Sequence, residues 1–258
     1  MQITKIDKLK NNKYKITFEE SKIITFDNVI LENNLLYKKY IDIELYNKIL
    51  KETEYYDIYN RTLKYILKRR KSEKEIREYL IDKGLNTQQI DNIILKLKKI
   101  NLINDKEYCN AFINDSIYLG KNGINKVRKE LLNKGISISI IEEALIGIDE
   151  NVFENKLEKM IIKKIKLNKK YSVTYLKQKI LNEMINLGYE KDKILNILDK
   201  NCISDTNITK KEFDKIYIKL SKKYSGIELI KNIKNKMVLK GFNLDEINSL
   251  IEQKNKEE

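Results

Sequence analysis

The chain of 258 residues contains no histidine, no proline and only two cysteines, Cys109 and Cys202. The absence of histidine removes the commonest general base and the commonest metal ligand of proteins. Two cysteines make neither a disulfide framework nor a metal site, and both neighbour apolar helical positions where a free cysteine packs as a small apolar residue. There is also no glycine-rich phosphate loop of the G-x-x-x-x-G-K-[ST] type. The sequence therefore predicts no catalytic residues, no cofactor and no metal ion, and a protein that is not an enzyme.

Long apolar runs are missing as well. No stretch approaches the ~18 uninterrupted apolar residues of a membrane span, and the first residues lack the profile of a secretory signal. We therefore expect a cytoplasmic protein without a membrane partner.

Positive charge is abundant, and it is unevenly distributed. Lys and Arg number 52 and Asp and Glu 38, which gives a net charge of +14. Residues 1–60 hold 10 of each sign, so the whole excess belongs to residues 61–258, with 42 basic and 28 acidic residues. An excess of Ile, Lys and Asn is typical of an AT-rich genome, and that bias accounts for part of the charge. The remainder favours a polyanion or an acidic protein surface as the partner.

Four glycines, Gly84, Gly135, Gly188 and Gly241, lie 51, 53 and 53 residues apart within one repeated apolar pattern. Apolar residues recur eight, four and three positions before each glycine, and six, nine and ten positions after it. The spacing before the glycine is that of a helix, and a glycine just past the last apolar residue is typical of a helix end. The period predicts tandem copies of one three-helix unit, which form an elongated, curved solenoid.

Cap residues and the period divide the chain into expected helices. Asn86 and Gln89 have the spacing of a capping box, and Ser172 and Ser225 are expected to cap the helices that follow them. The expected helices of the repeats are 72–83, 86–99, 104–119, 124–134, 137–146, 150–168, 172–187, 190–199, 209–223, 225–240 and 243–255. The expected divisions are an N-terminal module at 1–60, repeats at 61–119, 120–171 and 172–224, and a partial repeat at 225–258.

The N-terminal module differs in kind. Residues 2–8, 13–19 and 22–26 are rich in Ile, Tyr, Phe and Thr and are separated by polar turns, which predicts a small antiparallel meander. Residues 27–36 and 42–59 have a helical pattern. The fold class is thus mostly α with one small β-containing module.

Basic clusters provide the candidate interaction residues. A solvated helix face explains such clusters about as well as a binding surface does, and the confinement of the charge to the repeats favours binding. Arginine binds phosphate or carboxylate better than lysine does, so the leading candidates are Arg69, Arg70, Arg77 and Arg128. Tyr55, Tyr56 and Tyr59 could stack on bases, although packing is the commoner role of such a group. The candidate residues for contact with a nucleic acid or protein partner are Lys68, Arg69, Arg70, Lys71, Lys74, Arg77, Lys121, Arg128, Lys163 and Lys164.

Several segments together resemble a known family. They are LKRRKSEKEI at 67–76, LIDKGL at 80–85, LINDKEY at 102–108, Ala111-Phe112, Lys121-Asn122-Gly123 and VRKELLNKGI at 127–136. In this order they resemble the bacterial RecX regulatory proteins over about two repeats. The chain departs from the family pattern at Asn101, where glycine is usual, at Asn104, where aspartate is usual, and at Ile124, where proline is frequent. These departures change turn chemistry and leave the apolar pattern intact.

The resemblance implies a function. RecX proteins bind the filament of the RecA recombinase and modulate it, usually by inhibiting ATP hydrolysis, strand exchange and filament growth in recombination, DNA repair and the SOS response. It implies a monomeric partner of RecA, with direct contact to single-stranded or double-stranded DNA left open. Two other readings remain: a RecA-independent DNA-binding protein built from helix-turn-helix-like units, and an adaptor solenoid whose charge keeps it in solution.

Overall fold

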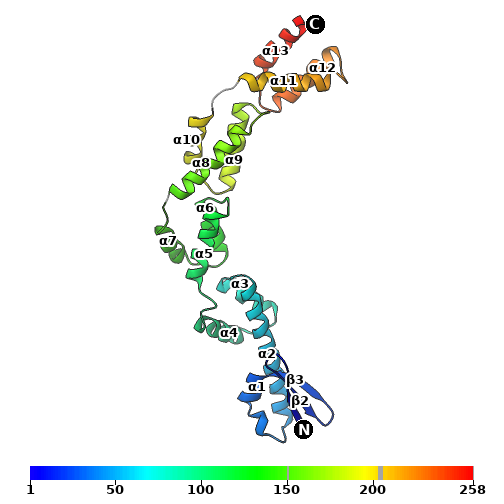
Figure 1. Cartoon of the computed structure of the whole chain (residues 1–258), viewed down its shortest axis with the longest axis vertical. Helices are drawn as coiled ribbons and strands as arrows, with labels where there is room; N and C mark the ends of the chain where they lie inside the picture. Colours follow the sequence, from blue (N-terminus) through cyan, green and yellow to red (C-terminus); the bar gives the residue numbers. More distant parts are fainter. Residues whose placement is uncertain (150, 203–205, 258) are drawn as a thin grey trace. The chain divides into compact units, whose positions relative to one another are not determined.

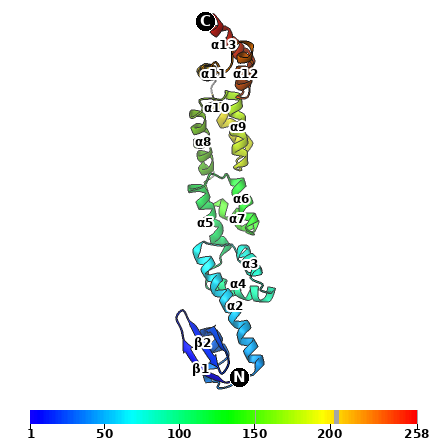
Figure 2. The same ribbon diagram turned by 90° about the vertical axis from the view of Figure 1, so that its right-hand side faces the viewer.

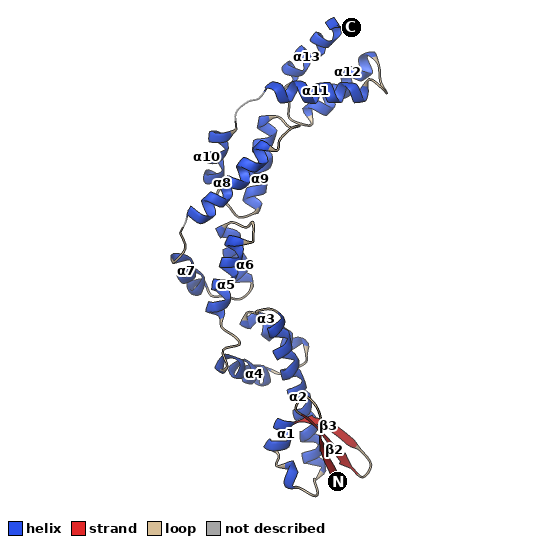
Figure 3. Ribbon diagram, in the orientation of Figure 1, coloured by secondary structure: helices blue, strands red, loops and turns tan. Residues whose placement is uncertain are grey.

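The computed structural model describes residues 1–149, 151–202 and 206–257 and consists mostly of helices (Figure 1). Among the residues that the structure describes, strands occur only near the N-terminus (Figure 3). The chain forms two compact units, one of Met1–Tyr108 with Lys134–Ile136 and one of Cys109–Asn133 with Ser137–Glu258. The expected class, mostly α with tandem helical repeats and one small β-containing module, is confirmed. No described helix has both the length and the apolar composition required to cross a membrane.

The expected meander is present. Strands β1 (Ile3–Lys8), β2 (Lys13–Phe18) and β3 (Lys22–Phe26) form an antiparallel sheet in that order, with a register shift between Ile3 and Lys5. The sheet packs against the first part of α2 (Ile43–Lys68), as Figure 2 shows. Alternate residues of the strands, such as Ile16 and Phe18, are buried with residues of α1 (Asp27–Glu32) and α2, so the module has its own core.

Two expectations for this region need correction. The expected helix at 27–36 is divided into α1 and a short 3₁₀ helix, η1 (Leu35–Tyr37), because Asn34 adopts a left-handed conformation with a φ of 50° between them. The second expected helix, 42–59, continues to Lys68 as α2. The expected division at residue 60 therefore falls within one continuous helix, which carries the module's core at one end and repeat residues at the other.

Each helix expected in the repeats has a counterpart. They are α3 (Glu73–Asp82), α4 (Thr87–Lys99), α5 (Asp105–Tyr118), α6 (Ile124–Asn133), α7 (Ile138–Ile146), α8 (Asn151–Lys166), α9 (Val173–Asn186), α10 (Lys191–Asn201), α11 (Thr206–Leu220), α12 (Gly226–Val238) and α13 (Leu244–Glu257). Glu150, where α8 was expected to begin, lies outside the described residues. Helix α11 begins three residues before its expected start at 209.

The local signals that end and begin these helices act as expected in most places. The four periodic glycines have φ between 80° and 84°, the left-handed conformation that ends a helix. Asn86 and Gln89 form the expected capping box, and Ser172 accepts a hydrogen bond from the Tyr175 amide. Ser225 is the exception, because its side chain makes no capping hydrogen bond.

The apolar pair that precedes each glycine is only half buried. The residue four positions before the glycine is fully buried in every copy: Leu80, Leu131, Met184 and Met237. The residue three positions before it is 42–60% exposed: Ile81, Leu132, Ile185 and Val238. Adjacent residues on a helix point about 100° apart, so one of each pair faces the core and the other faces solvent.

Two cores within the repeats show which helices pack together. One joins the second half of α2 with α3 and α4, and another joins α11, α12 and α13. In both, a longer helix comes first and the two helices of the glycine hairpin follow. The expected repeat 225–258 begins at the hairpin, one helix after the start of this core, whereas the expected repeat 61–119 begins within α2. A sequence period defines the length of a repeat but not its first helix, and the division of the chain stays a prediction.

The hairpins also contact one another through a recurring hydrogen bond. In each case the acceptor is the carbonyl oxygen of the residue just before a periodic glycine. The Ser72 hydroxyl donates to Lys134 at 2.7 Å, the Gly123 amide to Leu187 at 2.7 Å, and the Ser172 amide to Lys240 at 3.0 Å. The first residues of one hairpin are thus hydrogen-bonded to the turn of the next hairpin.

Candidate functional site

The basic segment Lys68–Lys71 occupies the break between α2 and α3. Helix α2 ends at Lys68, Arg69 is extended, and Ser72 begins α3 with a complete capping box to Glu75. The buried Ser72 holds the segment in place because its hydroxyl also bonds to Lys134. Lys68, Arg69 and Arg70 are exposed.

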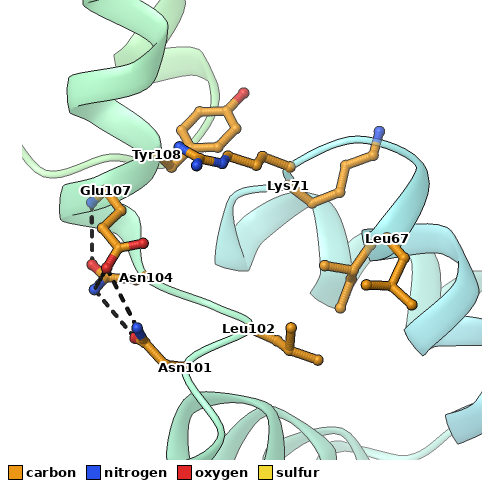
Figure 4. Close-up of a pocket in the computed structure, with 9 residues that line it drawn as sticks. Leu67, Lys71, Asn101, Leu102, Asn104, Glu107 and Tyr108 are labelled. Carbon is orange, nitrogen blue, oxygen red and sulfur yellow. Dashed lines mark hydrogen bonds between the residues drawn. The ribbon is translucent and has the colours of Figure 1, made fainter.

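The basic segment forms one side of a hollow of about 320 Å³, which we call the basic hollow (Figure 4). The other side is the turn between α4 and α5 together with the first residues of α5. The lining residues are Ile66, Leu67, Arg70, Lys71, Asn101, Leu102, Asn104, Glu107 and Tyr108. All of them belong to the first compact unit.

The cations around the basic hollow are not equally available. Lys71 is only 16% exposed, lies 4.5 Å from the centre of the Tyr65 ring and 3.9 Å from a carboxylate oxygen of Glu75. Within the described part of the chain, neither Arg69 nor Arg70 has a carboxylate at ion-pair distance. A guanidinium that is exposed and unpaired offers its fork of N–H groups to phosphate or carboxylate.

The opposite wall is held by an amide network. Asn104 accepts hydrogen bonds from the amides of Lys106 and Glu107, and its side-chain amide donates to Glu107 at 3.2 Å (Figure 4). Asn101 has a φ of 56°, the left-handed conformation for which glycine is usual and which asparagine tolerates best among other residues. The two asparagines that depart from the family pattern therefore support the same turn.

Tyr108 is among the residues that line the basic hollow, and it is largely buried. Burial, together with the nearby carboxylate of Glu75, raises the pKa of its hydroxyl to about 12. The side chain is therefore neutral at physiological pH. In the sequence, Tyr108 stood out only as the last residue of the family-like segment at 102–108, and nothing related it to residues 68–71.

Two of the leading arginines are paired within their own hairpins. Arg77 donates to Glu73 at 2.8 Å and to Asp91 at 2.7 Å, and Arg128 donates to Glu142 at 2.7 and 3.3 Å. Both arginines stand seven residues before a periodic glycine, and Asp91 and Glu142 stand seven after it. They therefore join the two helices of a hairpin, which the sequence prediction did not anticipate.

The remaining candidates are dispersed. Lys74 lies 3.9 Å from Glu78, and Lys164 lies 2.7 Å from Glu183, whereas Lys121 and Lys163 are exposed. The first compact unit contains Lys68, Arg69, Arg70, Lys71, Lys74 and Arg77, and the second contains Lys121, Arg128, Lys163 and Lys164. Only Arg70 and Lys71 line the basic hollow.

The tyrosines considered for base stacking are largely engaged in packing. Tyr56 is buried and its hydroxyl donates to Glu32, and Tyr55 and Tyr59 pack against the cores. The Lys96 ammonium lies 5.4–5.9 Å from the centres of all three rings. Their position agrees with the packing interpretation.

Comparison with known proteins gives a consistent result. A family model described as "RecX, second three-helix domain" matches residues 104–145, which take in α5, α6 and α7. A Streptococcus agalactiae protein named "Regulatory protein RecX" is 31% identical over 98% of this chain and 99% of its own length. This chain belongs to the RecX family. A RecX protein of Streptococcus mutans is 30% identical over the same shares of the two chains.

Solved RecX structures share the fold. One crystal structure of a regulatory protein RecX matches with a TM-score of 0.64 and 22% identity, over 77% of this chain and 98% of that one. RecX from Lactobacillus salivarius matches with a TM-score of 0.51 and 25% identity, over 57% and 96%. The residues that the family model matches contain α5 followed by the hairpin of α6 and α7, the same order of a longer helix before a hairpin as in the two repeat cores described above.

Proposed function

We propose that this RecX-family chain binds the RecA nucleoprotein filament and inhibits RecA's ATP hydrolysis, filament growth and strand exchange. The observation that carries the proposal is the 31% identity to a RecX regulatory protein over almost the whole chain. We propose further that it acts as a non-enzymatic monomer in the cytoplasm.

The repeated units suggest how such binding would work. In the first and the last copy the hairpin and its preceding helix form a small core, and copies of the hairpin recur every 51–53 residues. A partner made of identical subunits would meet one copy after another, so that individually weak contacts add through high effective concentration. In this mechanism the charge of +14 raises the rate of encounter with a filament that carries DNA.

Within the first unit, we propose that Arg69 and Arg70 make the principal contacts with DNA phosphate or with acidic RecA surface. Both are exposed and lack an ion-pair partner among the described residues, whereas Arg77 and Arg128 already bind carboxylates. Lys68 and Lys71 contribute charge beside them. Lys74, Lys121, Lys163 and Lys164 remain secondary candidates, and replacing Arg77 or Arg128 is expected to act first on hairpin stability.

The test is single-stranded-DNA-dependent ATP hydrolysis by RecA, with this protein titrated in at substoichiometric amounts. We expect inhibition well below one copy per RecA subunit. The variant Arg69→Glu/Arg70→Glu should require at least about tenfold more protein for the same inhibition, since each reversal turns an attraction into a repulsion.

The matched control is Lys222→Glu/Lys223→Glu, which makes the same charge change at two exposed residues in another turn. Equal loss of inhibition in both variants would show a general charge effect and contradict the assignment to Arg69 and Arg70. No inhibition by the unaltered protein, even in excess at low salt, would overturn the proposed function. DNA binding that needs no RecA would then favour the independent DNA-binding protein.

A further inference from the structure

One face of α12, with the start of α13, exposes large apolar side chains at the last repeat. Ile227 is 88% exposed, Leu239 75%, Leu244 51% and Val238 46%. They belong to an open hollow of about 870 Å³, which we call the α12 groove. Its lining residues are Ile227, Ile230, Lys231, Lys234, Asn235, Val238, Leu239 and Leu244. No carboxylate is among these described residues.

The other copies of the repeat are polar where the α12 groove is most apolar. The position fourteen residues before the glycine is Ile227 here, but Arg70, Lys121 and Thr174 in the earlier copies. The position two residues before the glycine is Leu239 here, but the exposed residues Asp82, Asn133 and Asn186 in the earlier copies. The apolar face is therefore a property of the last copy and does not follow from the repeat pattern.

An apolar face at this place is costly for a free protein. Large exposed apolar patches mark sites of interaction in soluble proteins. The α12 groove is such a patch, which indicates that a partner covers it.

The shape and charge of the α12 groove define that partner. Ile227, Lys231, Lys234 and Val238 follow one another at spacings of three and four residues along α12, so they form a stripe about 16 Å long. The stripe has apolar side chains at both ends and two lysines between them. An amphipathic helix lying along it would bury its own apolar stripe and bring carboxylates to the lysines.

A second copy of this chain fits less well. Its own α12 groove would bring another Lys231 and Lys234 to the interface, and like charges at an interface are unfavourable. We therefore propose that the α12 groove binds an acidic amphipathic helix of a partner protein. This inference goes beyond the proposed inhibition of RecA, because it requires neither DNA nor a filament.

The test uses the whole protein and a fluorescein-labelled peptide of about 18 residues, with leucine at i, i+3, i+4 and i+7 and glutamate at most other positions. Two comparison peptides are needed: one with the same composition in scrambled order, and one with lysine in place of glutamate. Fluorescence anisotropy should show binding of the acidic amphipathic peptide at least about tenfold tighter than of either comparison peptide.

The variant Ile227→Glu/Leu239→Glu should weaken this binding by at least about tenfold. Its matched control is Leu119→Glu/Ile146→Glu, which replaces two equally exposed apolar residues elsewhere in the second unit, 82% and 85% exposed. Circular dichroism checks that both variants retain their helices. Binding that survives Ile227→Glu/Leu239→Glu, or that is lost equally in the control, would overturn the proposal.

Sedimentation velocity tests whether a second copy of this chain, rather than a partner protein, occupies the α12 groove. If the protein self-associates and Ile227→Glu/Leu239→Glu abolishes that association, a second copy occupies the groove and the proposal is wrong. A monomer at all concentrations, with selective binding of the acidic peptide, is the result expected. Since no RecA is present, this outcome is independent of the proposed inhibition.

Discussion

The turns at Gly84 and Gly188 have nearly the same backbone but different surroundings. Their φ values are 81° and 84°. A methyl group added at Gly84 would meet no atom within 4 Å, whereas one at Gly188 would collide with the backbone nitrogen of Lys126. Gly135 and Gly241 resemble Gly188, since an added Cβ would lie 2.7 Å from Lys74 Cβ and 2.5 Å from Tyr175 Cβ respectively.

The comparison shows that glycine meets two separate requirements in these turns, a left-handed backbone conformation and close packing against another hairpin. At Gly84 glycine is needed only for the left-handed conformation, because the turn at Gly84 does not pack against an earlier hairpin. At the later glycines the turn also lies directly on the start of the preceding hairpin, where it supplies the carbonyl of the recurring hydrogen bond. The periodic glycines of the sequence therefore indicate contact between neighbouring repeats as well as the end of a helix.

The largest effect that tests this comparison is expected from Gly188→Ala. Backbone strain and collision together should destabilise the hairpin of α9 and α10 by about 2–4 kcal/mol, whereas Gly84→Ala should cost only about 1 kcal/mol in strain. Amide hydrogen exchange of residues 173–201 and 73–99 measures the two effects locally. Gly147→Ala is the control, since Gly147 has open space around it and no positive φ, and it should be close to neutral. Equal costs at Gly84 and Gly188 would contradict the packing explanation.

A smaller effect should distinguish two versions of the recurring hydrogen bond. Ser72 makes it with its side chain, and Ser172 makes it with its backbone amide. Ser72→Ala removes both a helix cap and the bond to the Lys134 carbonyl, so it should destabilise the first unit by about 2 kcal/mol. Ser172→Ala removes only the cap and should cost about 1 kcal/mol. Thermal unfolding followed by circular dichroism compares the two variants, and an equal loss would show that the Ser72–Lys134 bond adds nothing.

Much of the fold was accessible from the sequence because the signals are local. A glycine after a helical apolar stripe ends a helix by its own conformation, and Asn86 or Ser172 begins the next by bonding to an amide three residues on. What local patterns could not determine was which helix begins a packing unit, or which member of a pair such as Leu80 and Ile81 faces the core. These depend on neighbours supplied by distant parts of the chain.

The candidate site was accessible only in part for the same reason. The run of charge at 68–71 is visible in the sequence, and the structure leaves Arg69 and Arg70 exposed. The other wall of the basic hollow, from Asn101 to Tyr108, comes from a turn more than 30 residues away and has no pattern that relates it to the basic run. Arg77 looked equally suited to a partner, because its pairing with Asp91 arises only when the hairpin closes.

The smallest expected effect concerns how the hairpins are held together internally. The first two carry the pairs Arg77–Asp91 and Arg128–Glu142, whereas the third has leucine at both equivalent positions, Leu181 and Leu195. Arg77 is 37% and Asp91 49% exposed, so solvent screens the pair strongly. The hydrogen bonds that Arg77 donates to Asp91 and Glu73 raise the pKa of its guanidinium, which stays charged at physiological pH.

A double-mutant cycle with Arg77→Ala and Asp91→Ala should therefore give a coupling energy of about 0.5–1 kcal/mol. The control is the pair Arg61–Asp57 within α2, where the coupling should be about 0.3–0.5 kcal/mol because both residues lie on one helix. The decisive variant is Arg77→Leu/Asp91→Leu, which gives the first hairpin the residues of the third. If apolar contact replaces the ion pair, this variant should be at least as stable as the unaltered chain in urea unfolding. A loss larger than that of Arg77→Ala/Asp91→Ala would show that the first hairpin depends on the charges themselves.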